Sequence, residues 1–182
     1  MIFETHAHYD DEQFDEDREQ LLAGLQEAGI ETVVNVGATL EGCLSTIRLA
    51  EQYPFIYAAV GVHPDDADKV DAAVLDEIRR YCDMEKTVAV GEIGLDYYWH
   101  KEKEEHLVQQ KVFRQQMDIA REKKLPFMIH SRDAAEDTLN IVREYMKDGM
   151  YGGVIHCFSY SKEIAREYLN MGLYLGIGGV VT

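Results

Sequence analysis

The feature of this 182-residue chain that most limits its fold is a regular alternation of short apolar runs with longer amphipathic runs. Strands that are covered on both faces read as nearly continuous apolar runs, whereas exposed helices carry apolar residues three and four positions apart. The alternation therefore predicts a parallel sheet covered by helices. The predicted strands are residues 2–6, 32–37, 55–62, 87–93, 126–130, 153–156 and 173–178.

Amphipathic segments fill the intervals between the predicted strands. One carries Leu40, Cys43, Leu44 and Ile47 on a single helical face, and six complete helices are expected in all. We predict one α/β domain over residues 1–182 with the architecture of a TIM (β/α)8-like barrel. Because a complete eight-unit barrel typically needs about 250 residues, we expect a barrel truncated after about the seventh strand. It would lack the C-terminal βα unit or units and stay open between its first and seventh strands.

The charge balance limits which partners such a domain takes. The net charge is −16, from 34 acidic and 18 basic residues. Proteins that coat nucleic acid need a basic face, so this function class is disfavoured. An enzyme that takes one strand end into a pocket remains compatible, because bound cations supply positive charge there. The acidic stretch at 10–20 is interpreted as a solvated loop and first helical turn.

Composition and the chain's opening residues predict a cytoplasmic protein. Apolar residues make up 46% of the chain and charged residues 29%, and no apolar run approaches the roughly 18 residues that a membrane span needs. The opening MIFETHAHYD has no basic or apolar leader region. No obligate protein partner is evident. Three cysteines without a C-x-x-C motif argue against a disulfide framework or a thiolate zinc site, so Cys43, Cys82 and Cys157 are expected as small apolar residues.

Four histidines and one glutamate fall where the predicted strands end. His6 and His8 lie two residues apart at the end of the first strand, which places both on one face. Glu92, His130 and His156 end the fourth, fifth and sixth strands. In a parallel barrel these carboxyl ends meet at one rim, where active sites are built. We therefore expect four imidazoles and a carboxylate around one cavity.

This set of side chains predicts a metal site. Nitrogen and oxygen ligands without thiolate suit zinc, manganese or iron, with magnesium also compatible at the more oxygen-rich position. A carboxylate between two sets of imidazoles is suited to bridge two ions, and such a pair activates a water and stabilises a leaving oxygen. Any one of these histidines alone is more simply a satisfied polar residue. A carboxylate on an apolar strand is costly when unpaired, and all five residues together favour metal binding.

Several neighbouring residues have two interpretations each. His63, at the end of the third strand, either binds substrate or caps the loop before Pro64. Arg132 either binds a phosphate or pairs with Asp133 or Asp137. Asp96 either orients a ligand or caps its loop. The histidines of the charged segment that follows, which are expected to be solvated, are His100 and His106.

Five motifs give the chain a resemblance to a known family. In order they are ETHAHYDDEQFDEDR, GVHP, VGEIGLDYYWH, PFMIHSRDA and GVIHCFSYS. Over the whole chain they resemble the TatD deoxyribonuclease family. The resemblance implies a TIM-barrel fold and divalent-metal-dependent hydrolysis of phosphodiesters. Members of that family are 3′–5′ DNA exonucleases, and related members act on aminoacyl-tRNA esters.

The resemblance also implies roles for individual residues. His6, His8 and Glu92 would bind one divalent ion, while Glu92, His130 and His156 would bind a second, with Glu92 bridging the two. The ions would be magnesium, zinc or manganese. The family also uses a catalytic aspartate in a T-D-S/T-P motif after the eighth strand. No such motif occurs in this sequence, so that aspartate is expected beyond Thr182. The substrate implied is the end of a DNA or other nucleic-acid strand.

Four other functions remain open at this point. A PHP-type phosphoesterase also opens with H-x-H, but its further motifs are not found here. An amidohydrolase with a carboxylated lysine is disfavoured because the fourth strand ends in Glu92 and not in lysine. An aminoacyl-tRNA ester deacylase would use the same site. The last is a fragment that binds metal without catalysis, because the eighth-strand aspartate is absent.

Overall fold

A single parallel sheet forms the centre of the protein. The structure, a computed structural model, describes residues 2–181. Its strands pair in chain order as one seven-stranded sheet, and every neighbouring pair is parallel. The strands are β1 (Ile2–Ala7), β2 (Ile30–Val36), β3 (Ile56–Val60), β4 (Thr87–Asp96), β5 (Phe127–Arg132), β6 (Gly153–Ile155) and β7 (Tyr174–Leu175).

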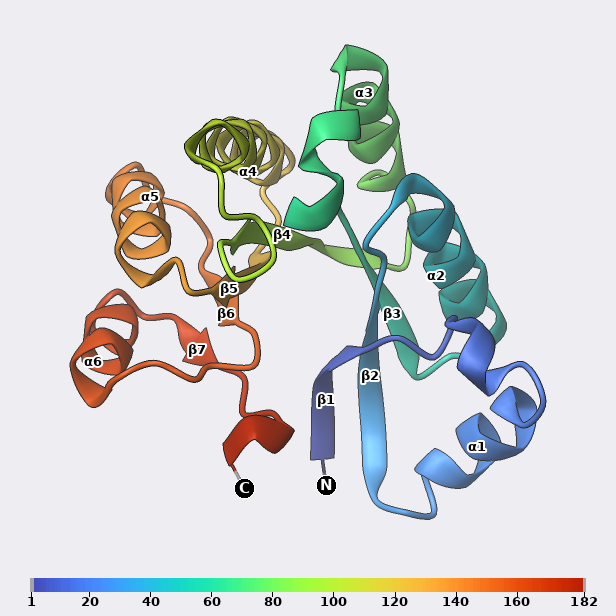
Figure 1. Ribbon diagram of the computed structural model, residues 1–182. Coiled ribbons are helices and arrows are strands. Elements are labelled where there is room, and N and C mark those ends of the chain that lie inside the picture. Colours follow the sequence, from blue (N-terminus) through green and yellow to red (C-terminus); the bar gives the residue numbers. More distant parts are fainter. Residues whose placement is uncertain (1, 182) are drawn as a thin grey trace.

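Helices cover the outside of this curled sheet (Figure 1). Several begin at a side-chain cap, since the Thr39 and Asp71 side chains accept hydrogen bonds from the backbone N–H groups of Gly42 and Val74. The α-helices are α1 (Arg18–Leu25), α2 (Leu40–Gln52), α3 (Ala72–Tyr81), α4 (Lys103–Lys123), α5 (Ala135–Lys147) and α6 (Lys162–Asn170). Short 3-10 helices are η1 (Glu12–Phe14), η2 (Pro64–Lys69) and η3 (Gly179–Val181).

The prediction of an α/β, TIM-like barrel with seven strands is confirmed. β1 and β7 form the two edges of the sheet, and within residues 2–181 they do not pair with each other. The sheet therefore curls around an interior without closing, and the N- and C-terminal ends of the chain lie on either side of the opening in Figure 1. None of the helices in this range is long and apolar enough to cross a membrane.

Successive side chains of each strand point to opposite faces of the sheet, which produces two buried layers. The main core joins residues such as Val33, Ile56 and Ile129 to the helices outside the sheet. A smaller cluster inside the curl consists of Val34, Val36, Ala59, Ala89 and Met128. Because Met128 also contacts His6, with its Sδ 2.9 Å from Nδ1, this inner cluster forms the floor of the candidate site.

The structure corrects the predicted ends of four strands. Glu92 and His130 do not end their strands but lie within them, because residues Gly94–Asp96 continue β4 by pairing with residues 130–132 of β5. His63 lies beyond β3, which ends at Val60. The seventh strand is much shorter than predicted, because only Tyr174 and Leu175 pair with β6. Cys43, Cys82 and Cys157 are free, the first two are buried and the third is half-buried, as expected.

Candidate metal centre

The Glu92 carboxylate lies at the centre of the histidine cluster. Its strand places it inside the curl, where the residue is 5% exposed. Oε2 lies 3.3 Å from His6 Nε2 and 3.7 Å from His8 Nε2. Oε1 lies 3.0 Å from His130 Nδ1. The two oxygens of one carboxylate thus face two different sets of imidazoles.

The H-x-H pair is oriented by the neighbouring strand. His8 Nδ1 lies 2.8 Å from the carbonyl oxygen of Val36. A carbonyl only accepts, so this nitrogen carries the proton and the Nε2 lone pair is left facing the cluster. The His6 and His8 Nε2 atoms are 2.9 Å apart. This convergence of nitrogen atoms is the arrangement expected around a shared cation.

Asp96 performs both of the roles that the sequence left open. The residue is 1% exposed, and its Oδ2 lies 3.0 Å from His130 Nε2. Its Oδ1 accepts hydrogen bonds from the backbone N–H groups of Tyr98 and Trp99, at 2.9 and 3.0 Å. A carboxylate behind a histidine fixes the ring orientation and leaves the other nitrogen for a ligand. Asp96 therefore positions His130 and the loop after β4 together.

His63 and His156 lie on different sides of this cluster. His63 packs edge-on against His130, with ring centroids 4.4 Å apart, while its Nδ1 accepts from the N–H of Asp65 and caps η2. His156 is stacked on His6 at 3.4 Å. Ligand atoms of His63, Glu92 and His130 lie within 4.8 Å of one another. The distances thus bring His63 into the cluster, a position that the sequence analysis assigned only to substrate binding or loop capping.

Burial and pairing shift the pKa values of these groups in opposite directions. Burial raises the pKa of Glu92, but hydrogen bonds from His130 and His6 outweigh it and hold that pKa well below its usual value. Burial lowers the pKa of His130, but the hydrogen bond to Glu92 reverses the effect and the pKa is raised. Burial, aided by the charge of His6, lowers the pKa of His156 to about 4. Burial and the charge of His130 lower the pKa of His63, so the imidazoles of His156 and His63 are both neutral at neutral pH.

The donor atoms fit divalent cations. Within residues 2–181 two groups of ligand atoms satisfy a common-ion distance, His6–His8–Glu92 and His63–Glu92–His130, and they share Glu92. Both contain only nitrogen and oxygen donors; imidazole nitrogen suits zinc, and carboxylate oxygen suits manganese and magnesium. The shared carboxylate directs one oxygen to each group. The residues present therefore fit a divalent-metal site, with Glu92 common to both groups.

A hollow of about 560 Å³ opens beside the histidines and is lined by His130, His156, Tyr98, Arg132 and their neighbours. Arg132 is exposed, and its guanidinium lies 3.9 Å from the centre of the Tyr98 ring. Within the described part of the chain, Arg132 forms no ion pair with Asp133 or Asp137. Asp137 instead accepts a hydrogen bond from the Tyr97 hydroxyl. The positive charge is therefore available at the mouth of the site.

The prediction that His100 and His106 are solvated is wrong, because both are half-buried. His100 Nε2 lies 3.1 Å from Asp65 Oδ1. His106 donates from Nε2 to the His100 carbonyl at 2.8 Å and stacks on Tyr97 at 3.6 Å. The loop after β4 folds back on the first turn of α4, which shelters these rings. They hold the loop and lie outside the metal cluster.

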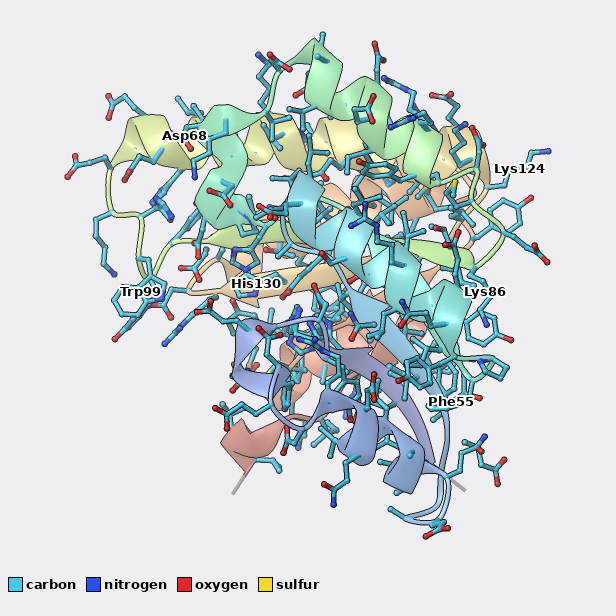
Figure 2. All side chains as sticks on the ribbon, turned by 90° about the vertical axis from the view of Figure 1, so that its right-hand side faces the viewer. Phe55, Asp68, Lys86, Trp99, Lys124 and His130 are labelled. Atoms are coloured by element: carbon cyan, nitrogen blue, oxygen red, sulfur yellow. The ribbon has the colours of Figure 1, made fainter. Side chains whose placement is uncertain are left out.

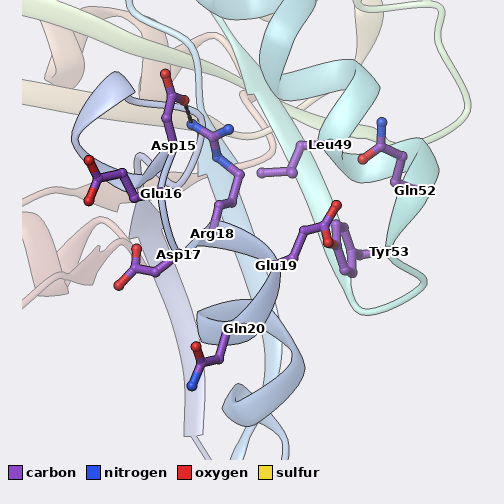
Figure 3. Close-up of a pocket in the computed structure, with 9 residues that line it drawn as sticks. All are labelled: Asp15, Glu16, Asp17, Arg18, Glu19, Gln20, Leu49, Gln52 and Tyr53. Carbon is purple, nitrogen blue, oxygen red and sulfur yellow. Dashed lines mark hydrogen bonds and ion pairs between the residues drawn. The ribbon is translucent and has the colours of Figure 1, made fainter.

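The acidic stretch forms a second hollow, of about 470 Å³, between the start of α1 and the end of α2 (Figure 3). Asp15 pairs with Arg18 there at 2.6 Å. Arg18 also donates to the backbone carbonyls of Tyr9, Asp10 and Asp11 and so holds the loop that follows His8. None of the clustered histidines lines this hollow. Arg18 therefore supports that loop, and the hollow lies apart from the candidate metal centre.

Comparisons with known proteins agree with this geometry. Residues 3–182 match the family described as TatD related DNase. The chain is 42% identical over 182 residues to the uncharacterized metal-dependent hydrolase YabD of Bacillus subtilis, covering all of this chain and 70% of that protein. It is 32% identical over 181 residues to the 3′–5′ ssDNA/RNA exonuclease TatD of a Rahnella species, covering 99% and 68%. The crystal structure of YjjV, a TatD homologue from Escherichia coli, superposes with a TM-score of 0.89 at 29% identity, covering 100% and 69%.

Proposed function

Because the chain belongs to the TatD-related DNase family of metal-dependent hydrolases, we propose that it hydrolyses phosphodiester bonds at the 3′ end of a DNA or other nucleic-acid strand. The name of the Rahnella relative supports this substrate class. Two divalent ions, magnesium, zinc or manganese, would be held by His6, His8, Glu92, His130 and His156. Glu92 would bridge them.

The observation that carries the proposal is the split environment of one carboxylate. Glu92 presents Oε2 to His6 and His8 and Oε1 to His130. A bridging carboxylate needs one oxygen on each side, and a buried carboxylate with only one neighbour would not need this symmetry. Divalent ions bound there supply the Lewis-acid chemistry that phosphodiester hydrolysis at neutral pH requires.

The remaining residues orient the substrate and the ligands. Arg132, which pairs with no carboxylate among residues 2–181, would bind a phosphate of the strand through its guanidinium donors. Asp96 and the Val36 carbonyl keep the rings of His130 and His8 in place. His63, beside His130, would bind either the substrate or the second ion. The open hollow next to His130 and His156 gives a strand end room to enter.

The direct test is digestion of a single strand carrying a label at its 3′ end. We expect release of labelled mononucleotide with added Mg²⁺, Mn²⁺ or Zn²⁺ and none with EDTA, because the chelator removes the cations that would activate the attacking water. Protein with Glu92→Ala, purified in parallel, controls for contaminating nucleases. Cleavage that resists the chelator, or release of an aminoacyl group from charged tRNA in place of strand cleavage, would contradict the proposal.

A second prediction separates His63 from His156 as ligands. If His156 completes the second ion site, His156→Ala should lower the bound metal from about two ions per chain toward one, while His63→Ala should retain both and mainly raise KM. Elemental analysis together with titration calorimetry measures this. The opposite result, with loss of an ion only in His63→Ala, would assign that ligand position to His63, as its grouping with Glu92 and His130 suggests.

A further inference from the structure

We propose that Trp99, with Tyr98 and Arg132 beside it, forms a subsite on which a base of the nucleic-acid strand stacks next to the metal centre. We call these three residues the Trp99 platform. The inference rests on the proposed nuclease function, and it adds to it how the strand is held. The ligand is a nucleobase of any sequence, with its adjoining phosphate.

Large aromatic surface is exposed at this platform. Trp99 is 65% exposed and Tyr98 is 40% exposed. Their rings meet edge to face, with centroids 4.7 Å apart. The Arg132 guanidinium lies 3.9 Å from the Tyr98 centroid and 5.6 Å from the Trp99 centroid. In Figure 2 Trp99 lies at the outer margin of the molecule, with His130 further in. An open indole face beside a cation is the pairing that binds a base and its phosphate.

Hydrogen bonds to the buried Asp96 and to the neighbouring residues hold the platform in place. The carboxylate of Asp96 accepts from the backbone N–H groups of Tyr98 and Trp99 and also contacts His130. Preceding them, Tyr97 is fixed by its hydroxyl, which donates to Asp137 at 2.8 Å. Lys101 donates to the Tyr97 carbonyl and lies 5.1 Å from the Tyr98 ring centroid. The exposed indole therefore has a defined position relative to the candidate metal ligand His130.

The platform is continuous with the site. Tyr98 and Arg132 line the same hollow as His130 and His156. A strand whose scissile phosphate lies at the histidines would bring a neighbouring nucleotide to this wall. Stacking on an aromatic face is tolerant of sequence because every base has a π-face.

The charges around the platform agree with a phosphate-bearing ligand. Several arginines elsewhere on the surface pair with carboxylates, as Arg114 does with Glu144 and Arg143 with Glu167. Arg132 has no such partner among the described residues. On a chain with a net charge of −16, an unpaired cation between an aromatic pair and a metal centre favours a polyanion that also carries rings.

Trp99 is the one tryptophan of the chain, so its fluorescence reports on the platform directly. We would titrate protein in EDTA, which prevents hydrolysis, with a single-stranded thymidine decamer and with an abasic decamer of the same length. We expect saturable quenching with the base-containing strand and little with the abasic strand. Raising the salt concentration should weaken the phosphate contribution and leave the preference for bases.

Substitutions at Trp99 test base stacking independently, with the fluorescence anisotropy of a labelled decamer as the measure of binding. Trp99→Leu should weaken binding by about tenfold or more, while Trp99→Phe retains most of the affinity. Tyr151→Leu is the matched control, because Tyr151 is also 65% exposed but precedes β6 at the opposite end of the sheet. Its affinity should equal that of the unchanged protein.

The outcomes separate this inference from the proposed function. Equal quenching by the abasic strand, unchanged affinity in Trp99→Leu, or no binding of either strand would overturn the stacking subsite. Absence of metal-dependent strand cleavage would overturn the nuclease proposal and leave base-dependent binding as a separate result. Cleavage without any effect of Trp99→Leu on affinity would retain the nuclease and remove the subsite.

Discussion

Glu92→Gln is expected to release bound metal and to lower nuclease activity by at least about 1000-fold, which is roughly 4 kcal/mol of transition-state stabilisation. The substitution keeps the size and one carbonyl oxygen but removes the negative charge and one of the two acceptor oxygens. Those oxygens face His6 and His8 on one side and His130 on the other. Mutation of an outer-shell partner of a metal ligand typically lowers metal affinity or activity 10- to 100-fold. Loss of a ligand shared by both groups should lower them more.

The measurements are metal content by elemental analysis and initial rates on a 3′-labelled single strand. Glu122→Gln is a matched control, because Glu122 pairs with Arg79 on the surface in the last turn of α4 and belongs to neither group of candidate ligands. It should keep both metal and activity. Circular dichroism confirms that Glu92→Gln is folded. Equal metal content in the two variants would refute Glu92 as a bridging ligand.

Much of the fold was predictable because burial on both faces of a parallel strand is visible in the sequence. All seven strands were found by their apolar runs. Errors occurred where a polar residue inside a strand was taken for its end. Glu92 is tolerated within β4 because three imidazoles surround it, and Gly94 continues the strand by pairing with His130. No local pattern distinguishes such a partnered carboxylate from a strand terminus.

The site was predictable only as a set of strand positions. Because the carboxyl ends of parallel barrel strands meet at one rim, the sequence predicts that His6, His8, Glu92 and His130 lie close together. The structure confirms their proximity. Strand positions alone do not show which imidazole ring faces which carboxylate oxygen. The contact of His63 with His130 could therefore not be predicted from the sequence. The contact of Asp96 with His130, which the sequence left open, also had a signal. Glu92 and Asp96 lie four positions apart within one strand, and an even spacing directs both toward the same face.

A second large effect is expected for Gly94→Ala, at the point where β4 passes β5. Gly94 has a φ of +148°, and a Cβ there would lie 1.9 Å from the carbonyl oxygen of His130. That oxygen belongs to a paired strand and not to a flexible side chain, so the two strands must separate. We expect a loss of about 3–4 kcal/mol of unfolding free energy. This corresponds to a melting temperature lower by about 10 °C, together with weaker metal binding because His130 moves away from Glu92.

Two other glycines supply the controls for this variant. Gly29 also has a positive φ, +87°, but nothing lies within 4 Å of a Cβ built there. Gly29→Ala therefore carries only the backbone strain, about 1–2 kcal/mol. Gly24 lies in α1 with open space around it, so Gly24→Ala should stabilise by up to about 1 kcal/mol. Chemical denaturation and metal titration of the three variants distinguish backbone strain at a positive φ from a steric clash of the added Cβ. The contrary result is that Gly94→Ala loses no more stability than Gly29→Ala and binds metal normally. That result would show that the close approach of β4 and β5 at Gly94 does not hold His130 beside Glu92.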